Sequence, residues 1–129
     1  MILDTSALLA ILFNEPEAAR FAARIEEASE GVYLSVASYL EAAMVIDRSA
    51  DAVRRALLDT FLAEFEISLE PVTPEQAKLA RQAFREFGRG NHPAALNFGD
   101  CLTYALAQVR REPLLFKGND FSRTDLLPA

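Results

Sequence analysis

Hydrophobic residues recur along the chain with two different periods, and their alternation predicts strands and helices in turn. Short apolar runs predict strands at residues 2–3, 32–34, 67–72 and 114–116. Apolar residues at helical spacing predict helices at residues 6–13, 15–29, 50–66 and 100–111. Two more helices have start signals. Ser35 or Ser38 can cap one that runs to Arg48, and Thr73, followed by Pro74 and Gln76, begins one that runs to Gly88.

Strands that are separated by helices indicate a parallel sheet, because a parallel pair of strands needs a long crossover. We therefore expect an α/β fold, with one domain over residues 1–129 and a parallel sheet of four to five strands flanked by helices on both faces. In such sheets the ligand site lies beyond the carboxyl ends of the strands. The stretch 89–98 is a long loop and hence a candidate functional segment.

The composition is that of a globular protein, with 51% hydrophobic and 25% charged residues among 129. The first 13 residues are apolar but contain Asp4 and lack a basic start, so we expect a cytoplasmic protein without a membrane segment. Cys101 is the only cysteine, which excludes an intrachain disulfide and a cysteine zinc cage. The net charge of −6 argues against a broad basic surface for nucleic acid, but allows a nuclease that meets phosphate through metal ions.

Four acidic residues are candidates for such a site. Asp4 ends the first predicted strand and Asp120 follows the fourth, so both belong to one rim of the sheet. Glu41 has mainly apolar neighbours on its helix, and we expect its carboxylate to point inward. Asp100 begins the last long helix, where the helix dipole favours an acid.

Each acid also has a purely structural interpretation. Asp4 and Asp100 could cap helices, and Asp120 could belong to a turn. Taken together, however, carboxylates in one pocket repel by about 4 kcal/mol per pair at 4 Å and an effective dielectric of 20, so they must protonate or bind a cation. Oxygen ligands suit Mg²⁺, or Mn²⁺, rather than zinc.

Four segments in this order resemble the PIN-domain ribonucleases, and among them the VapC-type toxins of type II toxin–antitoxin pairs. The segments are Leu-Asp-Thr-Ser-Ala at 3–7, Ser-Tyr-Leu-Glu-Ala at 38–42, Leu-Asn-Phe-Gly-Asp-Cys at 96–101 and Leu-Phe-Lys-Gly-Asn-Asp-Phe at 115–121. None of the segments is specific alone, but the ordered set covers nearly the whole chain.

The resemblance implies a Mg²⁺-dependent endoribonuclease that cleaves RNA with the acidic cluster Asp4, Glu41, Asp100 and Asp120. Asp4 and Asp100 would be the principal metal ligands, and the hydroxyl of Ser6 would assist nearby. Water would attack the phosphorus in line. The resemblance also implies a homodimer that a cognate antitoxin inhibits, and we expect the antitoxin to insert a basic group near Asp4 and Asp100.

Several alternatives remain open at this stage. Lys117, Arg85 and Arg89 could contact the RNA backbone or could be solvated surface residues, and His92 is not placed in the site. A strand-ending Asp also suggests a haloacid-dehalogenase-type phosphatase, but Ser6 stands where that scheme needs its acid/base Asp. A catalytically silent interaction module is a third possibility, with the apolar face of residues 50–65 either binding a partner or packing on the core.

Overall fold

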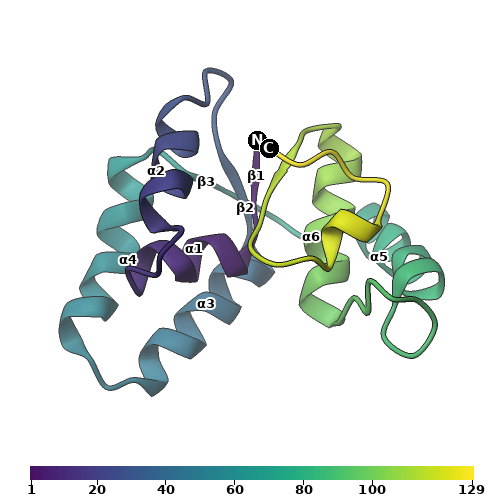
Figure 1. Cartoon of the computed structure of the whole chain (residues 1–129), viewed down its shortest axis with the longest axis horizontal. Coiled ribbons are helices and arrows are strands. Elements are labelled where there is room, and N and C mark those ends of the chain that lie inside the picture. The colour runs from purple at the N-terminus through teal and green to yellow at the C-terminus, as the bar shows by residue number, and fades with distance from the viewer.

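Three-residue and two-residue strands alternate with longer helices in the computed structural model, which describes residues 1–129 (Figure 1). The strands are β1 (Ile2–Leu3), β2 (Tyr33–Ser35), β3 (Ser68–Glu70) and β4 (Leu114–Leu115). The helices are α1 (Thr5–Leu12), α2 (Ala18–Glu26), α3 (Val36–Arg48), α4 (Ala52–Glu64), α5 (Pro74–Phe87) and α6 (Phe98–Arg110), and a short 3₁₀ turn, η1, spans Phe121–Arg123.

The sheet has four strands in the order β3-β2-β1-β4, and every pair is parallel. Ile2 pairs with Tyr33 on one side and with Leu114 on the other, so β1 lies in the centre. The predicted parallel α/β sheet is therefore confirmed. The strand order reverses at β1, because β2 lies on one side of it and β4 on the other. In open parallel sheets the ligand site lies at the carboxyl ends of the strands at such a reversal, which here is the end of β1.

Alternating strand residues divide the core into two clusters. Leu3, Leu34 and Leu115 belong to the cluster with α1 to α4, whereas Ile2 and Leu114 belong to the cluster with α5 and α6. Figure 1 shows α1 to α4 on one side of the sheet and α5 and α6 on the other. Because strand side chains alternate between faces, helices cover both faces of the sheet, as predicted.

Element bounds differ from the predictions by several residues at most, and the main differences have local reasons. The second helix begins at Ala18 rather than Glu15, since Asn14 has a left-handed φ of 51° and Pro16 lacks an amide hydrogen. The last long helix begins at Phe98, because Asn97 caps it. The strand predicted at 67–72 is limited to the edge strand Ser68–Glu70.

Two predicted helix caps are present. Ser35, not Ser38, caps α3. Thr73 caps α5 by accepting a hydrogen bond from the amide of Gln76 at 3.2 Å. The Gln76 side chain does not complete a capping box, because its Oε1 is buried without a hydrogen-bond partner.

The apolar face of α4 packs mostly on the protein's own core. Leu58, Phe61 and Leu62 are buried in the first cluster, and Phe65 packs partly against it. Val53 and Leu57 remain exposed. The packing interpretation of residues 50–65 is therefore the better one. No helix in the structure is both long enough and apolar enough to cross a membrane.

Candidate active site

Asp4 lies at the carboxyl end of β1 and caps helix α1. Its Oδ2 accepts hydrogen bonds from the Ser6 amide at 2.9 Å and from the Ser6 hydroxyl at 2.5 Å. The same hydroxyl accepts a bond from the amide of Lys117 at 3.0 Å, just after β4. Ser6 therefore ties the carboxylate of Asp4 to the segment that leads to Asp120. Asp4 is 4% exposed, which makes it the most buried of the four acids.

Asp100 lies in the first turn of α6 and takes part in a complete capping box. Its Oδ2 accepts a bond from the Asn97 amide at 3.0 Å, and its own amide donates to the Asn97 side chain at 2.9 Å. This reciprocal pair fixes the rotamer of Asp100 at the positive end of the helix dipole. Asp100 therefore has a structural role, but as the N3 partner in the box rather than as the cap itself, which is Asn97; its Oδ1 has no hydrogen-bond partner.

Glu41 lies on α3 and is solvent exposed, so the expectation that it points inward is wrong. The apolar neighbours that suggested burial, Met44 and Val45, are themselves 51% and 39% exposed. The Glu41 carboxylate instead lies against Gly99 at the start of α6. A Cβ at position 99 would be 2.3 Å from Glu41 Oε2, so only glycine leaves room for this arrangement.

Asp120 lies beyond β4 at the start of η1 and is exposed. Its negative charge is one of those that raise the pKa of Asp100. The charges of Asp4 and Glu41 act on Asp100 in the same way. Four acids from four separate segments are therefore electrostatic neighbours at one rim of the sheet, although their roles stay predictions.

Burial raises the pKa values of Asp4, Glu41 and Asp100, and repulsion from neighbouring acids adds to the effect on Glu41 and Asp100. Burial, followed by the charges of the other three acids, raises the pKa of Asp100 to about 6 despite the opposing Asn97 bond. Burial also raises the pKa of Asp4. Although Glu41 is exposed as a residue, its carboxylate is partly desolvated where it lies against the start of α6, and this together with the charge of Asp4 raises its pKa. None of the four acids forms an ion pair with Lys or Arg. The site therefore carries uncompensated negative charge that a cation would relieve.

The donor set fits Mg²⁺ with a partly hydrated shell. No group of three or more His, Cys, Asp or Glu side chains is close enough to surround one ion. Mg²⁺ commonly keeps several waters and binds through one or two carboxylates, so such a cage is not required. Asp4 and Asp100, whose carboxylates are held by Ser6 and Asn97, are the pair best fixed for direct ligation.

Hydroxyl groups below the site were not predicted from the sequence. Thr103 lies one turn after Asp100, and its Oγ1 is 3.1 Å from the Ser38 Oγ. A hydrogen bond from Thr103 lowers the pKa of Asp4, against the larger effect of burial. Thr5 donates to the Ser38 carbonyl at 3.4 Å. These buried contacts join α1, α3 and α6 beneath Asp4. The i+3 spacing from Asp100 was the one signal that could have identified Thr103.

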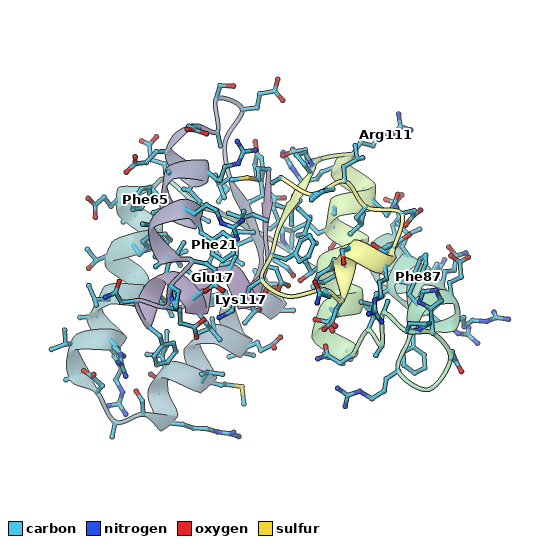
Figure 2. The ribbon with its side chains drawn as sticks, viewed as in Figure 1. Glu17, Phe21, Phe65, Phe87, Arg111 and Lys117 are labelled. Carbon is cyan, nitrogen blue, oxygen red and sulfur yellow. The ribbon has the colours of Figure 1, made fainter.

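Other singled-out residues have partners elsewhere. The ammonium group of Lys117 forms ion pairs with Glu15 and, at 3.3 Å, with Glu17, toward which it points in Figure 2. A substrate contact by Lys117 would require it to leave these glutamates. His92 accepts a bond from the amide of Ala94 at 3.1 Å and packs edge-on against Phe87. Cys101 is buried. The contacts of His92 and the burial of Cys101 therefore explain these two residues structurally.

Comparison with known proteins gives consistent matches over the length of the chain. The family model described as "PIN domain" matches residues 1–127. The chain is 55% identical to "Ribonuclease VapC28" of Mycobacterium tuberculosis over 125 residues, which cover 96% of this chain and 93% of the relative. It is 46% identical to "Ribonuclease VapC30" of the same species over 126 residues, covering 98% and 95% of the two chains.

Solved structures give the same fold at low sequence identity. A crystal structure of VapC20 from Mycobacterium tuberculosis, described as a "Sarcin-Ricin loop cleaving toxin", matches with a TM-score of 0.80 at 13% identity, over 99% of this chain and 97% of that one. A toxin–antitoxin complex from Klebsiella pneumoniae contains a chain that matches with a TM-score of 0.74 at 16% identity, over 99% and 95% of the two chains. At these identities the likeness concerns the fold alone.

Proposed function

The chain belongs to the PIN-domain family, and from this membership and its acidic site we propose that it is a metal-dependent endoribonuclease, the toxin of a toxin–antitoxin pair. Relatives that are 55% and 46% identical are named ribonucleases. The phosphatase alternative is not retained, because these relatives and the PIN match belong to a different enzyme class. We also propose that the PIN domain occupies residues 1–129 as one unit.

The observation that carries the proposal is the uncompensated charge at the carboxyl end of β1. Asp4 is buried, Asp100 has a pKa raised to about 6, and neither has a cationic partner. A folded protein tolerates such a pair at neutral pH at a cost in stability, which a bound divalent cation offsets. This arrangement supports metal-assisted hydrolysis of a phosphodiester.

Each residue of the site would have its own role in the reaction. Asp4 and Asp100 would hold Mg²⁺, with Mn²⁺ as a possible substitute, and the bound ion would supply charge stabilisation for the phosphate and a lowered pKa for water. Glu41 would orient the attacking water and accept its proton, since its raised pKa brings it closer to neutral pH. Asp120 would contribute a further carboxylate to the hydrated shell of the ion, and Ser6 would keep Asp4 in its rotamer.

The proposed partners are RNA, a cognate antitoxin and a second copy of the chain. A neighbouring structure is a toxin–antitoxin complex, which supports an antitoxin partner for a protein with this fold. We propose that the antitoxin silences the enzyme by inserting a basic side chain between Asp4 and Asp100, because the two carboxylates have no such partner within the chain. We also propose the homodimer and a cytoplasmic location.

Cleavage of a mixed cellular RNA pool tests the proposal. Wild-type protein with Mg²⁺ should produce defined fragments, and chelation with EDTA should stop the reaction. Asp4→Asn should leave RNA intact while keeping the circular-dichroism spectrum of the wild type. Intact RNA with the wild-type protein and Mg²⁺ would instead favour a catalytically silent interaction module.

A further inference from the structure

Helix α5 sorts its exposed side chains by charge around its axis. Lys78, Arg81 and Arg85 are three and four residues apart and share one face. Glu86 lies on another flank, where it lines a pocket with Tyr104 and Asp125. Arg89 follows the helix and continues the basic side. We refer to Lys78, Arg81, Arg85 and Arg89 as the basic stripe.

The basic stripe forms no ion pairs, although the exposed Glu75 lies three residues before Lys78 on the same helix. Basic residues on α2, α4 and α6, in contrast, do form ion pairs. In a chain of net charge −6, a run of unpaired cations on one helix face is a local exception. Exposed, unpaired cations at helical spacing present a track of positive charge that suits a polyanion.

An apolar groove of about 380 Å³ lies beside the basic stripe, between α5 and α6. Arg81 lines it together with six apolar residues, among them Phe84 and Phe98. The two phenylalanines are 46% and 83% exposed, which is unusual for so large an apolar side chain. The groove therefore combines accessible aromatic rings with a cationic edge.

The groove and the candidate active site lie on different faces of α6, at the same end of the helix: Phe98, Cys101 and Leu102 line the groove, whereas Asp100 and Thr103 belong to the site. Phe98 is the first residue of α6, directly before Gly99, against which the Glu41 carboxylate lies, and Asp100. At the same end, the amide of Arg89 donates to the Leu96 carbonyl at 3.1 Å, which places the end of the basic stripe next to the cap of α6. A strand of nucleic acid in the groove would reach the acidic residues by crossing over the first turn of α6.

We propose that the α5–α6 groove binds a single-stranded segment of the RNA substrate, with a base stacked on Phe98 and phosphates along the basic stripe. This inference rests on the proposed function and adds the surface that holds the substrate. Stacking on aromatic rings beside cations is how proteins bind single strands without reading sequence. A protein partner would match the apolar groove but leave the row of four unpaired cations unexplained.

Binding of RNA measured without cleavage tests the proposal. A fluorescein-labelled single-stranded RNA of mixed sequence is titrated, in Mg²⁺, with the Asp4→Asn chain, and its anisotropy is recorded at several salt concentrations. Adding Phe98→Ala should weaken binding by about 5- to 150-fold. Adding Arg81→Gln and Arg85→Gln together should reduce the salt slope of log K by about 1.4, or about 0.7 per phosphate contact.

The matched control is Arg48→Gln, which removes an exposed basic residue without an ion pair at the end of α3. It should leave the affinity unchanged. Equal affinity and salt slope in all variants would overturn the proposal. A Phe98→Ala variant that changes the oligomeric mass by light scattering, with RNA affinity intact, would also overturn it and assign the groove to a protein. If the variants weaken binding but the wild-type chain never cleaves RNA, the proposed function fails and the groove assignment stands.

Discussion

Replacing Gly99 by alanine separates the stability of helix α6 from the position of Glu41. Gly99 lies in the first turn of α6 and has no left-handed φ, so its backbone does not require glycine. Alanine favours helix over glycine by up to about 1 kcal/mol, which for a chain of this size would raise the melting temperature by about 3–5 °C. The fold should therefore tolerate the substitution or gain from it.

The added methyl group nevertheless occupies the place of the Glu41 carboxylate. The new Cβ would be 2.3 Å from Oε2 and 3.2 Å from the Cδ of Glu41. The carboxylate is the mobile end of a long side chain, so it must move by about 1 Å or more to reach van der Waals distance. A displacement of that size at a reacting group can lower the rate by about 100-fold. We expect kcat to fall while the protein remains at least as stable.

The assay is cleavage of a labelled RNA with Mg²⁺, together with thermal unfolding of the same preparations. The matched comparison is made in a Glu41→Gln background, where Gly99→Ala should have no further effect on kcat, because the two changes act through one group. Wild-type kcat in Gly99→Ala, or an equal loss in both backgrounds, would refute the idea that Gly99 acts by making room for Glu41.

Three further predictions concern stability and the support of the site. Without metal, the free energy of unfolding should fall as pH rises from about 4 to 6, because folded Asp100 keeps its proton up to a pKa of about 6 while the unfolded carboxyl titrates near 3.8. Urea titrations in EDTA should give a smaller dependence of the unfolding free energy on pH for Asp100→Asn than for the wild type, and an equal dependence would contradict this. Ser6→Ala removes the bonds to Asp4 and to the Lys117 amide, so it should cost about 1–2 kcal/mol and lower kcat several-fold; unchanged kinetics would contradict its positioning role. Leu58→Ala should cost about 2–5 kcal/mol in denaturant unfolding, yet leave activity per folded molecule unchanged, because this 4% exposed side chain lies in the core and away from the acids.

Periodicity and helix-start signals were enough to predict the parallel sheet and the order of its elements. Ile2 and Leu3 point to opposite faces, as the alternation of a strand requires, and Thr73 with Pro74 begins α5 as their residue types predict. The start of α6 was predicted two residues late. The reason is that Asn97 and Asp100 cap it together, and a capping box with Asn and Asp is less distinctive than the usual Ser or Thr with Glu.

The site was harder to predict because its geometry depends on contacts between distant segments. Glu41 was expected to be buried, since its neighbours on α3 are apolar, but that face of the helix is exposed. Its actual position depends on the absence of a side chain at Gly99, which no periodicity reveals. The bond between Ser38 and Thr103, 65 positions apart, likewise appears only once α3 and α6 are packed together.

Titration with Mn²⁺, followed by electron paramagnetic resonance of the free ion, tests most directly whether the acidic residues require a cation. We expect the wild-type chain to bind Mn²⁺ at pH 7.5, and Asp4→Asn and Asp100→Asn each to weaken that binding at least about tenfold, as loss of a charged ligand predicts. Glu64→Gln, which removes an exposed acid of α4, should bind like the wild type. Equal Mn²⁺ affinity in the wild type, Asp4→Asn and Asp100→Asn would contradict the account.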